Sequence, residues 1–536
     1  AEAWVAIETP RRWGGVLGVV EDNGAFEKGW ILGYDEGAFT FGISTEETDD
    51  GDGALVYLRA DSPYEMWSWH HVAATYGDGE ARLYVDGALA ASRPLTGRVI
   101  LADSARLTVG AYWDSDEQYP HDGRIARLRL VDETWTASEV QERMATAREL
   151  ADAEPWTDAI FEWTIPPYLT WPRPDGVSVL CETRTPSIAT LEVRAASEEK
   201  WIAVNPVSKD PARIAEFIVE GLMPATKYFY RVSATEASGG ATQSLLTSET
   251  RSFRTAPPEG DDSAFTFTVL SDTQTQGDVA ARVSGLAFEH RPNFVVHCGD
   301  LVDRGSTRSD WTETFFPNMR PLIEHAPLVP VLGNHEQDAK LYYDLMSLPA
   351  PERWYSLDYG HAAFFMLDGN RSLDDQSEQL RWLKKALAES KATWRFAVLH
   401  QPPYTSDSND YGDTALEAST QGDLNVRNIV EVLEKYGVDL CFSGHVHDYE
   451  RTFPIRAGKV VPYGDGGIIY VTAAGAGGGL EDFDATNTWF GHKKMRRHHF
   501  VHVAIHGDLL ELQAMDEDGR LFDVFSLRQR RSPEIR

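Results

Sequence analysis

Residues 264–300 read AFTFTVLSDTQTQGDVAARVSGLAFEHRPNFVVHCGD, and this stretch decides the fold of the second half of the chain. It opens with an apolar, β-rich run at Ala264–Leu270, continues into a helical stretch at Gly277–His290, and ends in a second apolar run at Phe294–His297. Strands that alternate with helices are typical of a layered α/β fold, in which chemistry gathers at the carboxyl ends of the strands. We therefore predict that an α/β domain begins here.

The same alternation continues towards the end of the chain. Further apolar strands are predicted at 328–332, 362–367, 395–399 and 440–443, with helices at about 309–325 and 377–389. The tail contains three more β-rich runs, at 500–505, 509–515 and 521–527. We expect these runs to form antiparallel strands that complete a second sheet.

Five short motifs occur where apolar strands run out into loops: Asp272-Thr273-Gln274, Gly299-Asp300, Gly333-Asn334-His335-Glu336, His400 and Gly444-His445-Val446-His447. Asp, Asn and His supply oxygen and nitrogen ligands, a set that suits paired Zn, Mn or Fe ions. Two such ions about 3.5–4 Å apart form the usual clamp for in-line attack on phosphorus. One carboxylate, that of Asp300, can bridge both ions. The motifs therefore predict a dinuclear metal-dependent phosphoesterase.

Length and charge limit the other choices. A chain of 536 residues is long enough for about three domains. Its formal charge of −33 argues against nucleic acid or an anionic membrane surface as a partner. No apolar run approaches the roughly 20 residues that a membrane span requires. The first residues show no signal peptide, and a mature secreted chain would look the same, so we expect a secreted or periplasmic protein although the sequence does not decide it.

The first 152 residues are rich in Gly, Asp and aromatic side chains and predict short strands. Asp86-Gly87 between two alternating runs is a strong hairpin signal. The segments Trp69–Tyr76 and Leu83–Gly87 together resemble the laminin-G-like, concanavalin-like jelly roll. This resemblance implies a β-sandwich, with a glycan or cell-surface polymer as its ligand. His70 and His71 fall inside a predicted strand, so we expect a structural role for both rather than metal binding.

A second β-rich stretch covers residues 156–257, and Pro257–Asp262 after it is the clearest linker in the chain. Within it, a turn feeds a tyrosine-rich strand at Gly221–Val232, which resembles a fibronectin-type-III sandwich. We therefore predict a multidomain chain: a laminin-G/concanavalin-like β-sandwich at 1–152, a fibronectin-III-like β-sandwich at 156–257, and a four-layer α/β domain at 263–536.

The last domain resembles the calcineurin-like metallophosphoesterases, and within them the purple acid phosphatase branch. The five motifs carry this resemblance, together with Asp448–Ile455, which directly follows the last of them. The resemblance implies two divalent transition metals. One would be bound by Asp272, Asp300 and His447. The other would be bound by Asp300, Asn334, His400 and His445.

Two positions depart from the pattern of that branch. Many relatives have Asp-x-His where this chain has Asp272-Thr273-Gln274, so Gln274 is either a weak, neutral metal ligand or a hydrogen-bond partner of a metal-bound water. Purple acid phosphatases place a tyrosinate three residues after the bridging aspartate, and here that residue is Asp303. We therefore expect Mn, Fe(II) or Zn rather than a purple ferric site.

The segment Gly299–Gly305, together with Gly333–Glu336, resembles the signature of serine/threonine protein phosphatases instead. That resemblance implies that His335 is the general acid, and that Asp303 orients it and raises its pKa. Arg304 would hold phosphate oxygens, the alternative being a surface salt bridge. The substrate would be a small phosphate ester, either a monoester or a diester, attacked by a metal-bridging hydroxide.

A competing hypothesis is a carbohydrate- or surface-binding protein whose phosphoesterase domain is a degenerate scaffold. The retained ligand set favours the enzyme. Two further motifs weigh less. Gly475–Gly479 lacks the Lys-Ser/Thr of a P-loop, and we expect it to allow a tight loop near the site. For the basic run Lys493–His499 we expect a solvated loop in preference to a substrate site.

Overall fold

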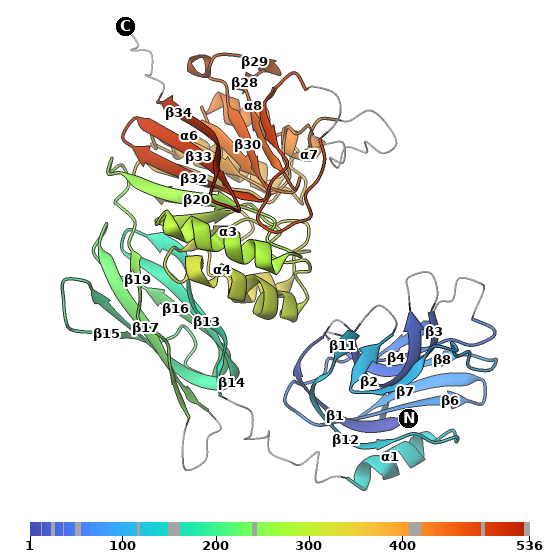
Figure 1. Ribbon diagram of the computed structural model, residues 1–536. Coiled ribbons are helices and arrows are strands. Elements are labelled where there is room, and N and C mark those ends of the chain that lie inside the picture. The colour runs from blue at the N-terminus through green and yellow to red at the C-terminus, as the bar shows by residue number, and fades with distance from the viewer. Residues whose placement is uncertain are drawn as a thin grey trace. The chain divides into compact units, whose positions relative to one another are not determined.

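The computed structural model describes residues 1–11, 13–22, 27–35, 37–48, 55–114, 118–147, 161–237, 244–406, 420–483 and 488–529. The chain divides into two compact units, Ala1–Asp158 with Thr307–Ser309, and Ala159–Ser306 with Asp310–Arg536 (Figure 1). The predicted boundary at 152–156 lies outside the described residues. The predicted boundary at 257–263 falls inside the second unit and stays a prediction.

The first unit is a β-sandwich of two five-stranded sheets. One sheet has the order β12 (Asp122–Arg129), β1 (Glu2–Thr9), β6 (His70–Gly77), β7 (Glu80–Val85) and β8 (Ala88–Pro94). The other has the order β5 (Val56–Arg59), β4 (Phe39–Ile43), β3 (Glu27–Tyr34), β2 (Gly14–Asp22) and β9 (Arg106–Val109). A pair β10 (Ala111–Trp113) and β11 (Gln118–Pro120), and a helix α1 (Ala137–Ala145), complete the described part.

Alternate side chains of these strands fill the space between the sheets. Val5 and Val72 from the first sheet and Leu32 and Phe41 from the second belong to one buried cluster, as the period-2 pattern of a strand with one buried face requires. The predicted hairpin turn is confirmed. β7 and β8 are joined by Asp86-Gly87 alone, with φ of 49° and 75°, the left-handed pair that such a turn needs.

The two neighbouring histidines of this unit have contacts within the sandwich. His71 is buried, and its Nε2 lies 3.4 Å from Glu2 Oε2. His70 Nδ1 lies 2.8 Å from Asp86 Oδ2 in the hairpin turn. The His71 imidazole thus links β6 to β1 and the His70 imidazole links β6 to the hairpin turn, which agrees with the structural role expected for them.

The second unit begins with long antiparallel strands. Its central strand β14 (Gly176–Ala195) pairs with β13 (Trp163–Arg173), β15 (Ile202–Val204), β16 (Ala212–Val219) and β17 (Lys227–Glu236), and β17 pairs with β18 (Leu245–Thr247) and β19 (Arg251–Arg254). β13 also forms a parallel bridge, Thr170 to Leu328, to the sheet that follows. The β-rich stretch and the first α/β strands therefore share one continuous 13-stranded sheet.

Two sheets make up the α/β part. In the first, β20 (Phe265–Leu270), β21 (Phe294–His297) and β22 (Leu328–Pro330) are parallel. The second has the order β23 (Tyr355–Tyr359), β24 (Ala362–Met366), β25 (Trp394–Val398), β26 (Leu440–Ser443), β30 (Ile469–Ala473), β27 (Tyr449–Thr452) and β31 (Gly491–Met495). The helices of the α/β part include α3 (Gly277–Glu289), α4 (Phe316–Ile323), α6 (Glu378–Glu389) and α8 (Val430–Lys435).

The strands of this part are apolar on both faces because each sheet is covered on both sides. Phe364 of β24 belongs to a core that also contains Phe267 and Phe294 of the first sheet, so this core lies between the sheets. Its neighbour Phe365 packs with Leu383 of α6 on the opposite face. Helices α3 and α4 cover the outer face of the first sheet (Figure 1). The predicted four-layer α/β fold is confirmed.

The structure corrects the predicted place of the tail. β32 (His499–His506) pairs antiparallel with β20, and β33 (Leu509–Asp516) and β34 (Leu521–Arg528) follow it, so the tail extends the first sheet and not a second one. β32 pairs with the edge of β20 that does not pair with β21. Part of the basic run is also strand rather than loop, since β31 ends at Met495. None of the helices in the described ranges combines the length and apolar character of a membrane span.

Candidate metal centre

The loops that carry the five motifs follow β20, β21, β22, β25 and β26, whose carboxyl ends meet at one edge of the two sheets. Asp272, Asp300 and His445 have φ of 61°, 52° and 76°, a left-handed conformation that non-glycine residues adopt mainly where the surroundings hold it. Gly299 allows the close approach of these loops. A Cβ there would lie 2.8 Å from both the Gly333 nitrogen and His400 Nδ1.

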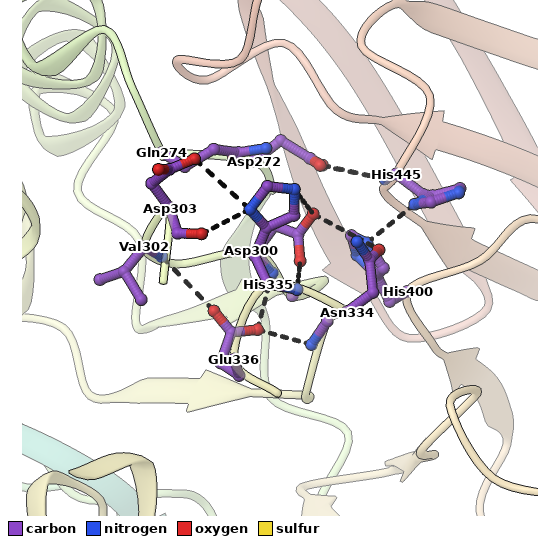
Figure 2. A network of polar contacts seen from close by, with 12 residues as sticks. Asp272, Gln274, Asp300, Val302, Asp303, Asn334, His335, Glu336, His400 and His445 are labelled. Atoms are coloured by element: carbon purple, nitrogen blue, oxygen red, sulfur yellow. Dashed lines mark hydrogen bonds and ion pairs between the residues drawn. The ribbon is translucent and has the colours of Figure 1, made fainter. Parts of the chain in front are cut away.

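Four predicted ligands converge on one point in Figure 2, and His400 is at the centre of them. Its Nε2 lies 2.9 Å from Asn334 Oδ1, 3.1 Å from Asp300 Oδ2 and 3.1 Å from His445 Nδ1. Asp300, His400 and His445 are all at least nine-tenths buried. Among the described residues, these three place ligand atoms within 4.8 Å of one another.

The remaining three predicted ligands form a second group next to the first. His447 Nε2 lies 3.3 Å from Asp272 Oδ1 and 3.0 Å from Gln274 Nε2. The two groups are joined through Asp272, whose Oδ2 accepts the backbone N–H of His445 at 3.0 Å. All seven residues predicted as metal ligands are thus brought together, in the two groups that the resemblance implied, except that Asp300 contacts only the first group.

Hydrogen bonds behind the ligands fix which imidazole nitrogen faces the centre. His400 Nδ1 donates to the Cys298 carbonyl at 2.8 Å, and His447 Nδ1 donates to the Gly479 carbonyl at 2.8 Å. Each bond leaves Nε2 as the ring nitrogen that faces the other ligands, the usual arrangement of metal-binding histidines. Burial lowers the pKa of His400, but the facing Asp300 carboxylate outweighs burial and raises that pKa to about 9.

The residues present fit a pair of divalent metals. Gln274 Oε1 is buried and has no hydrogen-bond partner among the described residues. A buried amide oxygen without a partner costs free energy, and a bound metal would supply that partner. His400 and His445 face each other through ring nitrogens, an arrangement that a shared cation explains. Carboxylate, amide oxygen and imidazole are the donors that Mn, Fe and Zn accept.

The three residues predicted to act on the substrate lie beside this centre. His335 Nδ1 donates to the backbone carbonyl of Asp303 at 2.6 Å, whereas the Asp303 carboxylate is farther away, 3.5 Å from the same nitrogen. His335 Nε2 lies 3.9 Å from Asp300 Oδ2, and the side chain is 35% exposed. Arg304 Nε lies 3.8 Å from Asp303 Oδ2, which is the surface pair considered as its alternative role.

One buried residue of the site had no role assigned from the sequence. Glu336 lies next to Asp300 in Figure 2, and its Oε2 accepts the backbone N–H of Asp300 at 3.0 Å. The same oxygen accepts the N–H of Gly333 at 2.6 Å, and Oε1 accepts that of Leu301 at 2.8 Å. Its carboxylate therefore ties the loop after β21 to the loop after β22. In the sequence, the one feature that could have pointed to Glu336 is the position of an acidic residue directly after His335, close to the end of an apolar strand.

The glycine-rich loop lies against the second ligand group, as expected of a tight loop near the site. The Gly478 N–H donates to the Asp272 carbonyl at 2.8 Å. A Cβ on Gly478 would lie 2.7 Å from three ring atoms of His447, so only glycine fits without displacing that imidazole. Two arginines of the basic run are paired with acids, Arg496 with Asp482 at 3.0 Å and Arg497 with Asp516 at 2.5 Å.

Comparison with known families identifies the class of this domain. Residues 265–449, a range that contains all the predicted ligands, match the family model described as calcineurin-like phosphoesterase. Residues 1–141 match the concanavalin A-like lectin/glucanases superfamily. The chain therefore contains a calcineurin-like metallophosphoesterase domain preceded by a concanavalin A-like β-sandwich, as the sequence motifs predicted. The fibronectin-III resemblance of the middle stretch stays a prediction.

Several relatives of this chain are named purple acid phosphatases. It is 24% identical over 460 residues to probable inactive purple acid phosphatase 27 of Arabidopsis thaliana, covering 76% of this chain and 73% of the relative. It is 28% identical over 311 residues to purple acid phosphatase 23 of the same plant, covering 51% and 64%. The fold resembles that of purple acid phosphatase PPD1 from yellow lupin (Lupinus luteus) seeds, with a TM-score of 0.59, 20% identity, and coverage of 68% and 75%. The matched domain and the relatives together support the assignment of this chain as a phosphoric ester hydrolase.

Proposed function

We propose that the chain is a dinuclear metal-dependent phosphoesterase that hydrolyses small phosphate esters, monoesters or diesters. The observation that carries this proposal is the convergence of Asp300, Asn334 and His445 on His400 Nε2, with a second group around His447 beside it. These contacts lie within residues 265–449, the range that matches the calcineurin-like phosphoesterase family model.

Two divalent ions, Mn, Fe or Zn, would be held by the two ligand groups. Asp272, Gln274 and His447 would bind one. Asn334, His400 and His445 would bind the other, and Asp300 would serve both. When bound, such ions supply Lewis-acid stabilisation of phosphoryl oxygens and an activated water. Asn334 and Gln274 contribute neutral oxygens, so the centre keeps a net attraction for an anionic substrate in a chain whose overall charge is −33.

His335 is proposed to protonate the leaving oxygen. Because Nδ1 is engaged by the Asp303 carbonyl, Nε2 is the nitrogen available to the substrate. It lies 3.9 Å from the buried Asp300 Oδ2, on a His335 side chain that is 35% exposed. Arg304 is proposed to bind phosphate oxygens. Its present partner Asp303 is 44% exposed and 3.8 Å away, a weak pair that a phosphate can replace.

The test is a hydrolysis screen of the metal-reconstituted chain with aryl monoesters, aryl diesters and nucleotides. In that screen, His335→Ala should reduce turnover by about 10²–10⁴-fold for alkoxide leaving groups and far less for activated aryl esters, which need no proton. His506→Ala, an exposed histidine of β32, serves as the control. Equal losses across the leaving-group series would reject His335 as the acid.

A second candidate function is a binding protein whose phosphoesterase domain no longer turns over. Gln274 favours it, because a neutral amide replaces the histidine of many relatives, and three related chains carry the name probable inactive. In this case the function would lie in the first unit. There, a cavity of about 320 Å³ is lined by Glu21, Arg106, Asp114 and the 43% exposed Trp113, a polar site with an aromatic platform suited to a sugar.

Hydrolysis by the metal-loaded chain, measured together with its metal content, separates the two candidates. About two transition-metal equivalents per chain, with hydrolysis of any ester in the screen, support the enzyme. A metal-bound chain without turnover that binds a glycan supports the second candidate. A secreted or periplasmic location is proposed for either function, since a glycan or polymer ligand would be met outside the cytoplasm.

A further inference from the structure

A cavity of about 210 Å³ lies in the second unit, where β17 and β19 meet the end of α3. These elements are neighbours in Figure 1. No predicted metal ligand lines the cavity. The residues that matter for its chemistry are Lys227, Arg254, Phe288, Arg291, Asn293 and His325.

The lining is positively charged in a strongly acidic chain. Lys227, Arg254 and Arg291 contribute full positive charges, His325 contributes an imidazole, and no acidic side chain lines the cavity. Across the described ranges, none of the three cations forms an ion pair with a carboxylate, although the chain has 83 acidic residues against 50 Lys and Arg. Unpaired like charges that face one space repel each other, and this cost is relieved when an anion binds.

Aromatic contacts fix the directions of these groups. The Arg291 guanidinium carbon lies 4.4 Å from the ring centroid of Phe288, and Phe288 stacks on His325 with centroids 4.9 Å apart and planes at 23°. His325 Nδ1 donates to the Ser252 carbonyl at 3.2 Å, which leaves Nε2 as its other hydrogen-bonding atom. The guanidinium and the imidazole are therefore held in place before any ligand arrives.

An amide adds a neutral donor to the same wall. Asn293 Oδ1 accepts the backbone N–H of Thr266 at 2.9 Å, and this bond fixes the side-chain amide so that Nδ2 is its remaining donor. Fixed donors of mixed charge, with arginine forks among them, match the several oxygens of a phosphate group.

We propose that this cavity binds a multiply charged oxyanion, either inorganic phosphate or the phosphate group of a small ester. The inference goes beyond the proposed function and does not depend on the metal centre, since the two sites share no residue. A volume of about 210 Å³ suits a small molecule and not a polymer.

The experiment is a calorimetric titration of the full chain, stripped of metals with a chelator, with inorganic phosphate and separately with phenyl phosphate. One saturable site is expected for at least one probe. The double variant Arg254→Gln/Arg291→Gln should weaken it by at least about tenfold, because two charge-assisted contacts are lost. Binding of inorganic phosphate alone identifies free phosphate as the ligand; comparable binding of phenyl phosphate identifies an organic phosphate.

The matched control is Arg520→Gln/Arg528→Gln, two arginines that are 70% and 72% exposed and that change the net charge equally. This control should bind as tightly as the native chain, and the lysine variant Arg254→Lys/Arg291→Lys should retain part of the affinity. Thermal melts of all variants verify folding. The proposal is overturned when the metal-free chain shows no saturable binding of either probe, or when both glutamine double variants weaken binding equally.

Discussion

Glu336 Oε2 accepts the backbone N–H of Asp300 at 3.0 Å, so a buried carboxylate supports the backbone of the residue proposed to bridge two metals. The same oxygen accepts the Gly333 N–H at 2.6 Å, one residue before Asn334. Ligands on the loops after two different strands are therefore positioned by a single side chain that does not belong to either ligand group. Precise placement by such supporting residues is what a metal centre requires.

Glu336→Gln should destabilise the chain by about 2–4 kcal/mol, since one oxygen becomes an NH₂ group that faces backbone N–H donors and leaves them unsatisfied. Urea unfolding with and without chelator measures this loss. Glu389→Gln at the exposed end of α6 is the matched control and should change stability by less than about 0.5 kcal/mol. Equal stability of both variants would show that Glu336 does not hold the loops.

Gly478→Ala should displace the His447 imidazole, because the added Cβ would lie 2.7 Å from the ring. Overpacking of this kind costs about 1–3 kcal/mol, and here the ring that moves belongs to the second ligand group. We expect reduced metal content and reduced hydrolysis with the fold retained. Gly479→Ala, next in sequence and with nothing within 4 Å of its Cβ, should leave both unchanged. Native metal content in Gly478→Ala would contradict the contact.

Gln274→His should strengthen metal binding in the second group. The amide oxygen of Gln274 is buried without a partner among the described residues, while His447 and Asp272 lie beside it, so an imidazole there adds a stronger ligand. We expect the weaker of two metal affinities to rise by roughly tenfold or more in a competition assay with a chromophoric chelator. Gln401→His, a change of the same type beside His400 in the first group, should not raise that affinity.

Acid should destabilise the chain partly through His499, which is far along the sequence from the ligands. Burial lowers the pKa of His499 to about 4, below the ordinary value of 6.5. The unfolded chain therefore binds this proton more readily than the folded chain. The contribution of His499 to the free energy of unfolding is present in full above pH 6.5 and is lost as the pH drops towards 4. Between about pH 7.5 and about pH 5 the loss is on the order of 2 kcal/mol.

His499→Asn removes this titration and should flatten the pH dependence of urea unfolding over that range. His506→Asn, exposed at the other end of the same strand, should keep the native dependence. A native pH profile in His499→Asn would show that another group is responsible for the acid loss.

Much of the fold could be predicted because local patterns agree with the tertiary structure. The runs at 264–270 and 294–297 became β20 and β21 within one residue, since strands covered on both faces are apolar throughout. The pairing of the tail with β20 could not be predicted, because the partner of a strand depends on contacts far away in sequence. For the same reason the sequence of the β-rich stretch does not reveal the 20-residue strand β14, which pairs with four other strands.

The ligand positions were predictable because each follows a strand directly. The contacts that support the ligands could not be predicted from the sequence. That the carbonyl of Asp303, rather than its carboxylate, lies closest to His335 Nδ1 depends on loop conformation. The role of Glu336 depends on backbone N–H groups, which leave no mark in the sequence.

The most direct measurement is the transition-metal content of the full chain, reconstituted with Mn or Zn and then desalted, compared with that of Asp300→Asn. The account predicts about two equivalents for the native chain and loss of both metals and of hydrolysis in the variant, because Asp300 is proposed to serve both ions. A native chain that retains no metal, or an Asp300→Asn chain that keeps two tightly bound ions, would contradict the bridged centre.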